Sequence, residues 1–387
     1  MLQLKYMEKL NILYICHTSN LGGAALSLYN MIHSMRDNIV PIVLLPQKGP
    51  AYELFTENNI RCIVHHFRMN IREKSNVKHI VKFLPHYLRD KYFNLRCVNS
   101  VISELNGIKI DIVHSNASVF TIGVDLSKKL SAKHVWHIRE FQDLDFNFQP
   151  FTGWKRLKKM IYASDAVIAI TKSVYNHWEL NKARNAYYIW DAVRSVSDIC
   201  LNTNKQKYFF FSSALLCEAK GASFAIKAFG LSNLASKGYK LIMAGNVTDN
   251  YKLELSRLIN EYKLKDNVNF VGYCKNIKQY MSSATAFLMC SENEGLGRVT
   301  VEAMFYGCPV IARNTGGTVE FIKDGENGFL FSDINSCVEI MEHVASVDVL
   351  NMLNNAQRCA IENFSEEKYG DKIIKIYKEM TNFDLIC

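Results

Sequence analysis

The amino-acid sequence predicts an α/β fold of two doubly wound domains, each with a parallel sheet covered by helices on both faces. Three observations lead to this prediction. The chain has 387 residues, and single hydrophobic cores stop growing at roughly 250–300 residues. Its composition, 49% hydrophobic and 21% charged, is that of an ordinary globular protein. Short aliphatic runs alternate with helical patterns along the whole chain, which is typical of parallel sheets with helical crossovers.

Each expected strand is a short β-branched or aliphatic run bounded by polar or turn residues. In the first half these strands are expected at 11–16, 40–45, 60–64, 111–115, 134–138 and 166–170. In the second half they are expected at 208–212, 240–244, 268–271, 285–289, 309–312 and 328–331. Helical patterns fill the intervals, for example at 24–35 and 51–58. The stretch 191–207 is polar and irregular, which suits a linker between two domains of similar size.

The composition also excludes several classes of protein. No apolar run approaches the roughly 18–20 residues of a transmembrane helix, and the apolar stretch near the N-terminus is too short for a signal peptide. The eleven cysteines include no C-x-x-C pair, so neither a zinc site nor a disulfide framework is indicated. We therefore expect a cytoplasmic protein with reduced thiols.

Positive charge is concentrated in the first half of the chain. Residues 1–200 hold 26 Lys+Arg and 16 Asp+Glu, against 20 and 21 in residues 201–387. The densest segment, 61–96, has nine basic residues and only two acidic ones, and 155–159 is a second basic cluster. Such patches concentrate anions such as phosphate, nucleic acid or acidic lipid. A merely solvated helical face is the alternative.

The most informative stretch is 290–330, which reads CSENEGLGRVTVEAMFYGCPVIARNTGGTVEFIKDGENGFL. An expected strand, 285–289, ends just before this stretch. A helix is expected to begin near Arg298, after a loop that contains Gly295 and Gly297. Glycines let a backbone approach a ligand closely, and free amides at a helix start suit a phosphate. Glu294 and Glu302 can each accept two hydrogen bonds from a vicinal diol. These residues predict a nucleotide-sugar site.

A second tight turn follows the next expected strand, where Gly316 and Gly317 precede a helix with Glu320. Together the two turns give the run E-G-x-G … E-A-M … G-x-P-V-I … G-G-x-x-E … G-x-x-G. This run resembles the signature of retaining glycosyltransferase family 4, which has the GT-B fold. The resemblance implies two Rossmann-like domains that face each other across a cleft. It also implies an acceptor-binding domain at 1–195, a donor-binding domain at 196–364, and a C-terminal helix in 365–387 that crosses back to the first domain.

The resemblance assigns roles to individual residues. Lys220 resembles the lysine that neutralises the pyrophosphate, and His137 lies in the stretch 136–140 that resembles the strand end presenting a histidine to the donor sugar. Glu294 is implied to contact sugar hydroxyls and Glu302 the ribose. Five further donor contacts are implied at Gly22, Gly23, Gly295, Leu296 and Gly297.

One position departs from the family pattern. Many relatives carry an arginine five residues before the phosphate-binding lysine, whereas this chain has Leu215 there. Arg298, beside the expected phosphate-binding turn, is placed to supply the missing cation. The alternative is an exposed arginine at a helix start, which the helix dipole would slightly disfavour.

The reaction implied by the resemblance is transfer of a sugar from a nucleotide diphosphate donor to an acceptor hydroxyl, with retention and with the leaving phosphate as base. It implies no cofactor and no metal. UDP-sugar is the expected donor class and GDP-mannose the next, and the sequence does not select between them. The implied acceptor is a lipid-linked glycan of a bacterial surface polysaccharide, such as O-antigen, capsule or exopolysaccharide. The basic and apolar segment 74–91 suggests peripheral attachment to the inner face of the membrane.

Other interpretations remain open. A nucleotide-sugar epimerase on the same fold would also need a nucleotide cleft, but the E-x7-E pair of Glu294 and Glu302 argues against it. A nucleic-acid binder built on the basic half would lack the aromatic stacking motif of RNA modules. Asp143 and Asp145 spell a D-x-D motif, which binds a metal in the other main glycosyltransferase fold. Gly295 and Gly297 imitate part of a dinucleotide fingerprint whose third glycine is missing.

Overall fold

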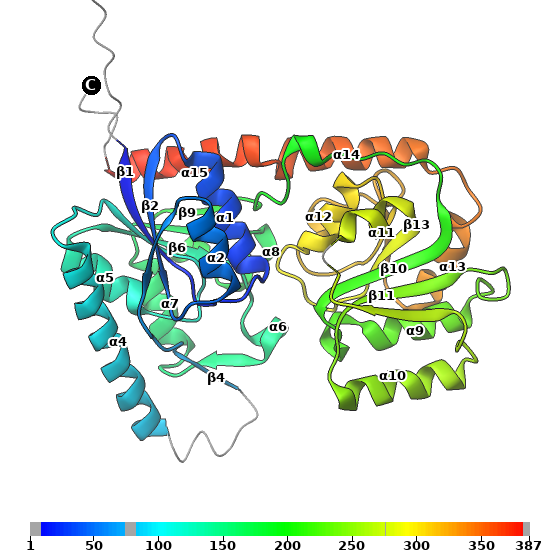
Figure 1. The fold of residues 1–387 in the computed structure, drawn as a ribbon, viewed down its shortest axis with the longest axis horizontal. Helices are drawn as coiled ribbons and strands as arrows, with labels where there is room; N and C mark the ends of the chain where they lie inside the picture. Colours follow the sequence, from blue (N-terminus) through cyan, green and yellow to red (C-terminus); the bar gives the residue numbers. More distant parts are fainter. Residues whose placement is uncertain (1–8, 74–82, 275, 382–387) are drawn as a thin grey trace, which may run out of the picture. The chain divides into compact units, whose positions relative to one another are not determined.

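The computed structural model describes residues 9–73, 83–274 and 276–381. The chain forms two compact units (Figure 1). Unit 1 comprises Met1–Ala192 together with Glu366–Cys387, and unit 2 comprises Val193–Ser365. The expected α/β architecture with two doubly wound sheets is confirmed, one sheet in each unit.

The sheet of unit 1 has seven strands in the order β3-β2-β1-β5-β6-β8-β9, and every neighbouring pair is parallel. Its strands are β1 (Leu10–Ile15), β2 (Ile39–Leu45), β3 (Arg61–Val64), β5 (Ile112–Ser115), β6 (Lys133–Ile138), β8 (Ala166–Ala169) and β9 (Ala186–Tyr188). Six of them match the expected strands, whereas β9 was not expected because it is a short edge strand. A separate antiparallel ribbon pairs β4 (Ile71–Glu73) with β7 (Phe148–Pro150).

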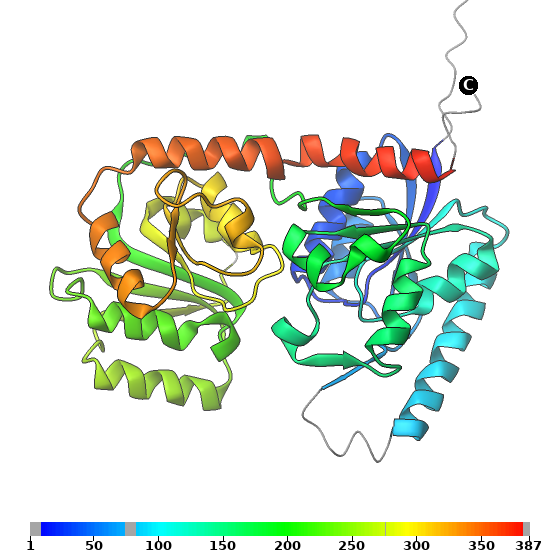
Figure 2. The same ribbon diagram turned by 180° about the vertical axis from the view of Figure 1, so that it is seen from behind.

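Helices cover both faces of this sheet (Figures 1 and 2). The helices of unit 1 are α1 (Gly23–Met35), α2 (Pro50–Glu57), α4 (Phe83–Leu105), α5 (Ile122–Leu130), α6 (Asp143–Phe146), α7 (Trp154–Tyr162), α8 (Lys172–His177) and α15 (Glu366–Thr381). One core joins α1, α2 and α15 to the sheet, and a second core joins α4 and α5 to its other face.

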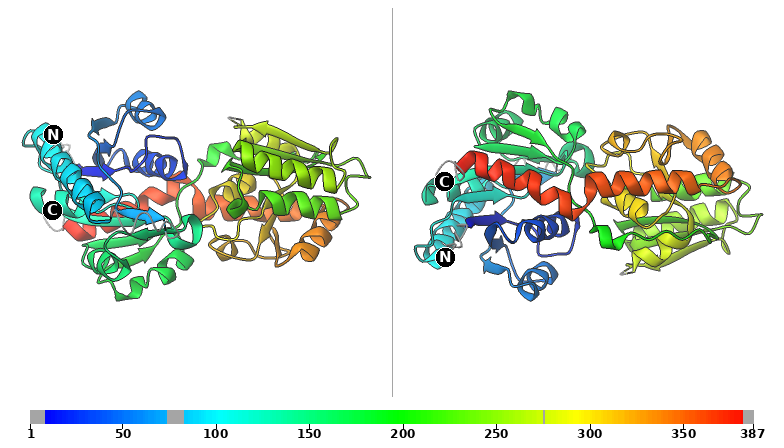
Figure 3. Two further views of the ribbon diagram at one scale, coloured as in Figure 1. Left: turned by 90° about the horizontal axis from the view of Figure 1, so that it is seen from below. Right: turned by 90° about the horizontal axis from the view of Figure 1, so that it is seen from above.

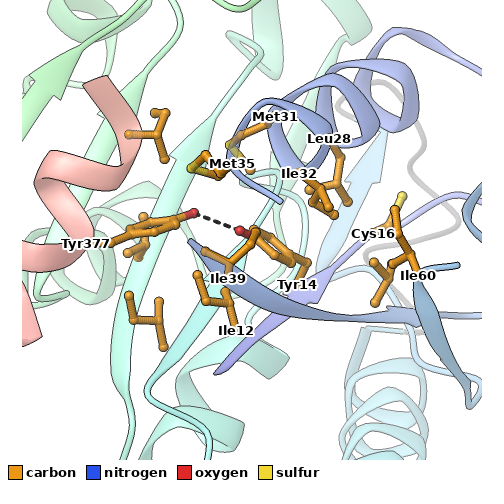
Figure 4. Packing of buried hydrophobic residues seen from close by; sticks show 14 of the residues in the cluster. Ile12, Tyr14, Cys16, Leu28, Met31, Ile32, Met35, Ile39, Ile60 and Tyr377 are labelled. Carbon is orange, nitrogen blue, oxygen red and sulfur yellow. Dashed lines mark hydrogen bonds between the residues drawn. The ribbon is translucent and has the colours of Figure 1, made fainter. Parts of the chain in front are cut away.

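Helix α15 packs closely on α1 (Figure 3). Gly370 permits this approach, since a Cβ there would lie 2.5 Å from the Ser34 carbonyl oxygen. Tyr377 of α15 enters the core beside Tyr14 of β1, and the two hydroxyls lie 3.5 Å apart (Figure 4). Helix α15 is therefore an integral part of the core of unit 1.

The sheet of unit 2 has six strands in the order β12-β11-β10-β13-β14-β15, again all parallel. They are β10 (Gln206–Leu215), β11 (Lys240–Asn246), β12 (Val268–Gly272), β13 (Ala284–Met289), β14 (Val310–Arg313) and β15 (Phe329–Phe331). The helices are α9 (Ala222–Leu231), α10 (Asp249–Glu261), α11 (Ile277–Ser283), α12 (Arg298–Phe305), α13 (Ile334–Val344) and α14 (Leu350–Phe364). Helices α9, α10 and α13 share one core on a single face of the sheet.

The segment before β10 runs along unit 2 and is held by hydrogen bonds. The amide of Cys200 donates to the Phe305 carbonyl over 3.1 Å, and the Gln357 amide group donates to the Cys200 carbonyl over 2.8 Å. A single 3₁₀ turn, Val196–Asp198, is the regular structure assigned to it before β10 begins at Gln206. The segment before β10 is therefore irregular in backbone but fixed by its hydrogen bonds.

Over the described residues, none of the helices combines the length and the apolar character that crossing a bilayer would require.

Candidate functional site

The carboxyl edge of the sheet in unit 2 brings together two residues that the sequence singled out. Lys220 follows β10 and Glu294 follows β13. The Lys220 Nζ lies 2.6 Å from Glu294 Oε1, and the Ser291 hydroxyl donates to the same oxygen over 2.9 Å. Their side chains remain 30% and 19% exposed, respectively. An accessible ion pair of this kind can exchange partners with a ligand.

The glycine after Lys220 explains how the lysine reaches this position. Gly221 adopts a φ of +74°, and a Cβ there would lie 2.4 Å from the Cys290 carbonyl oxygen. Only glycine tolerates both the left-handed backbone and the close contact. The loop after β10 is thus pressed against the end of β13, which sets Lys220 beside Glu294.

The two expected tight turns also meet. Gly317 donates its amide to the Glu294 carbonyl over 2.8 Å. Gly316 has a φ of +65°, and a Cβ there would lie 2.7 Å from the Glu294 carbonyl oxygen. The Gly-Gly pair therefore supports the loop that carries Glu294.

Helix α12 begins directly after Gly297, which has a φ of +75° and lies at the N-cap. Gly295, Leu296 and Gly297 are all buried. The hydroxyls of Thr300 and Thr318 are buried beneath this turn and have no hydrogen-bond partner within the described structure. A Cβ on Gly297 would lie 3.0 Å from the Thr318 Oγ1 and 3.3 Å from the Thr300 Oγ1. Sequence reasoning missed both threonines, since neither stands out among ordinary helix and turn residues.

Glu302 of α12 lies against an arginine that sequence reasoning did not find. The Arg194 Nη2 donates to Glu302 Oε1 over 2.9 Å, and the guanidinium also lies over the Tyr306 ring at 5.7 Å. Burial is the largest single influence and lowers the pKa of Arg194, but the nearby Glu302, Tyr306 and Asp198 and the hydrogen bond to Glu302 together outweigh it, so the pKa is raised. Arg194 belongs to the segment expected as a linker, where a lone arginine carries no motif.

Leu215 stands where many relatives have an arginine, and Arg298 is the residue expected to supply the missing positive charge. Arg298 is the first residue of α12, and its Nη2 lies 3.4 Å from the Val193 carbonyl oxygen. Leu215 ends β10 and is exposed. Leu215 therefore lies at the carboxyl edge of the sheet, where β10 ends and the loop to Lys220 begins.

In unit 1, three strand ends are linked by hydrogen bonds at the carboxyl edge of the sheet. Asn116, after β5, donates to the Ala24 carbonyl over 2.9 Å. Arg139, after β6, donates through Nε to the Asn116 Oδ1 over 2.8 Å. Gly22 is the N-cap of α1 and Gly23 is its first residue, and a Cβ on Gly22 would meet no atom within 4 Å. The Gly-Gly turn is thus tethered through Ala24 and has open space beside it.

His137 lies inside β6 and exposes none of its surface. Arg139 donates to its Nδ1 over 3.3 Å, and its Nε2 lies 3.7 Å from the Asp191 Oδ1. Burial, and then the charge of Arg139, hold the pKa of His137 well below its usual range. The ring is therefore neutral, and it lies behind Arg139 with no accessible surface of its own.

Arg139 belongs to a buried polar network that holds α15. Its guanidinium forms an ion pair with Asp191, and the Tyr369 hydroxyl donates to Asp191 Oδ1 over 3.0 Å. The Tyr377 hydroxyl lies 2.7 Å from the Nδ1 of His114. Sequence reasoning mentioned Arg139 only as a neighbour of His137, and it missed Asp191 because the partners are 52 residues apart.

Glu140 is also buried at this edge. It accepts hydrogen bonds from the Ser118 amide and hydroxyl over 2.6 and 2.5 Å. Burial is the dominant influence on this carboxyl and raises its pKa to about 7, although the bonds from Ser118 favour the charged form.

The D-x-D residues have protein partners. Asp145 accepts from the backbone amides of Phe141 and Gln142 over 3.0 and 2.8 Å. Asp143 lies 2.8 Å from His177. Within 9–73, 83–274 and 276–381, no group of three His, Cys, Asp or Glu side chains is placed to hold a metal ion. The motif serves as a local turn in this unit.

Comparison with known proteins gives concordant results. Residues 198–348 match the model of the family described as glycosyl transferases group 1. An uncharacterized glycosyltransferase of Methanocaldococcus jannaschii is 24% identical over 373 residues, which cover 94% of this chain and 96% of the relative. The alpha-monoglucosyldiacylglycerol synthase of Acholeplasma laidlawii is 22% identical over 73% of this chain and 79% of its own length. Anabaena HepE in complex with UDP and glucose has a TM-score of 0.78 at 19% identity, covering 96% of this chain and 100% of that one.

Proposed function

We propose that this chain is a nucleotide-sugar glycosyltransferase of the glycosyl transferases group 1 family, whose model matches residues 198–348. The proposed reaction transfers the sugar of a UDP-sugar to a lipid-linked glycan with retention at the anomeric carbon. The observation that carries the proposal is the Lys220–Glu294 pair at the sheet edge, beside the first turn of α12. It places a cation for a phosphate next to a carboxylate for a sugar.

The donor diphosphate is assigned to Lys220 and to the first turn of α12. Departure of a nucleoside diphosphate builds negative charge on the leaving oxygen, and preorganised donors stabilise that charge in the transition state. A helix start offers unsatisfied amides and a partial positive charge. The amides of Gly295, Leu296 and Gly297 are the proposed donors to sugar and phosphate oxygens, and Arg298 is the second proposed cation.

The sugar and the ribose are assigned to the two glutamates. Glu294 lies 2.6 Å from Lys220, so a sugar bound to its carboxylate adjoins the phosphate subsite. Glu302 is oriented by Arg194 through one carboxylate oxygen, and its second oxygen is the proposed partner of the ribose hydroxyls. Arg194 is therefore a positioning residue.

The carboxyl edge of unit 1 supplies the remaining proposed residues. Gly22 and Gly23, with open space beside Gly22, are proposed donor contacts, as the family resemblance implies. His137 has no exposed surface, so we assign it a positioning role behind Arg139 rather than direct contact with the sugar.

Relatives support the choice of donor and acceptor. Solved complexes of Anabaena HepE contain UDP with glucose, UDP alone and UDP-glucose, which favours UDP over GDP-mannose for this chain. The names of two relatives, a poly(glycerol-phosphate) alpha-glucosyltransferase of Bacillus subtilis and the Acholeplasma glucolipid synthase, refer to an anionic polymer and a lipid. They support a surface-polymer or lipid-linked acceptor.

Attachment to the inner face of the membrane is part of the proposal. The segment 74–91 contains four lysines, of which Lys74, Lys78 and Lys82 lie outside the described residues. In the described part, α4 exposes Leu88, Tyr92 and Leu95 on successive turns, and the neighbouring basic residues Arg89, Lys91 and Arg96 are exposed as well. Such a face suits an anionic membrane surface, where each Lys or Arg contributes about 1 kcal/mol.

A transfer assay tests the chemistry. Wild type, Lys220→Ala and Glu294→Ala are each given UDP-glucose, UDP-galactose, UDP-N-acetylglucosamine or GDP-mannose, and release of nucleoside diphosphate is measured. We expect turnover with a UDP-sugar. We expect Lys220→Ala to weaken donor binding by about 1.5–3 kcal/mol, as for a lost charged hydrogen bond, and Glu294→Ala to lower turnover more than affinity.

The same assay can overturn the proposal. Turnover with GDP-mannose alone would exclude the UDP donor, and unchanged kinetics in both variants would exclude the assigned site. An inverted anomeric configuration, read by proton NMR of the product, would exclude retention. Vesicles with anionic lipid test attachment, because a variant with Lys74, Lys78, Lys82 and Lys91 changed to glutamate should stay in the supernatant at low salt while the wild type pellets.

A further inference from the structure

A cavity lies in unit 1, at the opposite edge of its sheet from Asn116 and Arg139. It has a volume of about 530 Å³ and lies between α5 and α7, where β6 and β8 begin. Ligand sites for small molecules typically occupy about 300–1,000 Å³. None of the residues assigned to sugar transfer lines this cavity.

The walls of the cavity carry three cations. Lys128 comes from α5, and Arg156 and Lys159 come from α7. Asp125 lies close enough to Lys128 to interact with it electrostatically, whereas no ion pair of the described structure engages Arg156 or Lys159. Two of the three cations are therefore available to an anionic ligand.

The other titratable groups of the cavity do not cancel this charge. Asp165 is engaged by the Lys133 Nζ at 3.1 Å and by the His134 amide at 2.9 Å. The His134 ring contacts the hydroxyls of Ser115 and Ser164, and burial lowers its pKa to about 4, so it is neutral. The cavity thus presents a net positive charge.

Part of the lining is apolar, formed by the side chains of Val124, Ala132, Met160 and Ala163. A free phosphate would leave this surface unused, whereas a phosphate attached to a glycerol and acyl chains would cover it. Apolar burial contributes about 25 cal/mol per Å². Combined charge and apolar surface favour an amphiphile over an inorganic ion.

Helix α5, which forms one wall of the cavity, also packs on α4, the helix that we assign to the membrane. Helices α4 and α5 pack on the same face of the sheet (Figure 2). Lys91 of α4 acts electrostatically on Asp125 of α5, and Lys128, three residues further along α5, lines the cavity. The exposed apolar residues Leu88 and Tyr92 belong to the same α4.

We infer that this cavity binds the phosphate-bearing head group of an anionic membrane phospholipid, with Arg156 and Lys159 as the phosphate ligands and Met160 against the glycerol and upper acyl chain. The inference rests on the proposed membrane attachment and is independent of sugar transfer. It makes attachment selective for a lipid head group, beyond a general attraction between a basic face and a charged surface.

A charge-reversal experiment separates a specific site from a general basic face. Arg156→Glu/Lys159→Glu is compared with Lys129→Glu/Lys155→Glu, which makes the same change in charge at one residue of α5 and one of α7, neither of which lines the cavity. Binding is measured by co-sedimentation with phosphatidylcholine vesicles that contain phosphatidylglycerol. We expect the cavity variant to lose at least tenfold in partitioning and the matched variant to lose much less. Equal losses would overturn the inference.

A steric variant tests the cavity without changing charge. Ala163 lines the cavity and is exposed, so Ala163→Trp should fill it while the chain still folds. We expect about a tenfold loss of vesicle binding with unchanged UDP affinity and melting temperature. Unchanged vesicle binding would overturn the inference. Because UDP affinity is measured separately, failure of the transferase proposal gives a different result from failure of this one.

Soluble probes distinguish the source of the phosphate. The methyl resonance of Met160 is followed by NMR during titration with dihexanoylphosphatidylglycerol, dihexanoylphosphatidylcholine or inorganic phosphate. We expect a saturable shift with the first probe at concentrations where the other two give none. A shift with inorganic phosphate at the same concentration would assign the cavity to free phosphate and would overturn the lipid inference.

Discussion

The two units place an ion pair at the same edge of a similar sheet but use it differently. In unit 2, Lys220 and Glu294 are 30% and 19% exposed. In unit 1, Arg139 and Asp191 are 5% and 3% exposed and are joined by Tyr369 of α15. An exposed pair loses little when a ligand replaces one partner, whereas a buried pair must stay intact. Unit 2 therefore offers its charges to a ligand, and unit 1 uses its charges to hold a helix.

The surroundings of the two ion pairs also differ, because glycine turns support the pair in unit 2 and side chains surround the pair in unit 1. Around Glu294, the loops approach one another through Gly221 and Gly316, where a Cβ would clash with backbone atoms. Around Arg139, the contacts are between side chains, through Asn116 and Asp191. Glycine turns leave backbone amides near a ligand, whereas a side-chain network fills the space that a ligand would occupy. This difference is the reason why we propose most of the nucleotide-sugar contacts in unit 2.

The largest expected effect is on the stability of unit 1. Asp191→Ala leaves Arg139 buried without its carboxylate, which typically costs about 3–5 kcal/mol. Glu294→Ala leaves Lys220 able to reach water, so its cost should stay below about 1 kcal/mol. Hydrogen exchange of the β6 amides, compared with that of the β13 amides, measures each unit separately. Similar losses in both variants would contradict the contrast between the two pairs.

Glu140 provides the next effect, a dependence of stability on pH. Its pKa is raised by burial to about 7, from an ordinary value of 4.5. The folded state therefore favours the protonated form, and the stability from this group is fully present below about pH 4.5 and is lost as the pH rises through 7. The shift corresponds to roughly 3 kcal/mol.

Glu140→Gln isolates this contribution from other groups. His114 and His137 have lowered pKa values because of burial, so they change stability in the opposite direction over part of the same range. The difference in unfolding free energy between wild type and Glu140→Gln cancels the histidines. We expect that difference to change between pH 4.5 and 7, and a constant difference would show that Glu140 titrates normally.

The third expected effect is on UDP binding and concerns the ion pair between Arg194 and Glu302 in unit 2. Glu302→Ala should weaken UDP binding by about 1.5–3 kcal/mol, as for a lost charged hydrogen bond to the ribose. Arg194→Ala should raise KM with less change in kcat, because Arg194 acts through Glu302, and Arg194→Lys should recover part of the loss. 2′,3′-Dideoxy-UDP is the control ligand. If Glu302→Ala weakens UDP and this analogue equally, Glu302 does not bind the ribose.

The sequence predicted the regular parts of this molecule well. All twelve expected strands are present, because a parallel strand buried on both faces reads as a continuous aliphatic run. Strands β4 and β7 were missed because they form a separate two-stranded ribbon, and β9 was missed because its residues Ala186–Tyr188 include no β-branched or long aliphatic side chain. Strand β15 is equally short and also lies at an edge, but its Phe-Leu-Phe run was apolar enough to be predicted.

Within the candidate site, local motifs were predictable and distant pairings were not. Glu294, Gly316 and Gly317 lie within one signature, and the structure brings their loops into contact. Arg194 and Glu302 are 108 residues apart, and no sequence motif links the two positions. The burial of His137 was also unpredictable from its place at a strand end. Its ring packs against His114 of β5 and lies 3.7 Å from Asp191, and both residues are distant from it in the sequence.

The smallest expected effect concerns Arg298 and the departure at Leu215. The hydrogen bond from Arg298 to the Val193 carbonyl is long, at 3.4 Å, and contributes little at that distance. If Arg298 supplies the second phosphate cation, Arg298→Ala should weaken binding of UDP and GDP by about 1 kcal/mol each, because both share the diphosphate. Leu215 is exposed at the end of β10, so Leu215→Arg can be accommodated and should restore part of the affinity in the Arg298→Ala background. Isothermal titration of the wild type, both single variants and the double variant measures this coupling. Equal affinities of wild type and Arg298→Ala would make Arg298 an ordinary arginine at a helix start. Lys220 and the α12 amides would then be the groups that stabilise the negative charge of the diphosphate.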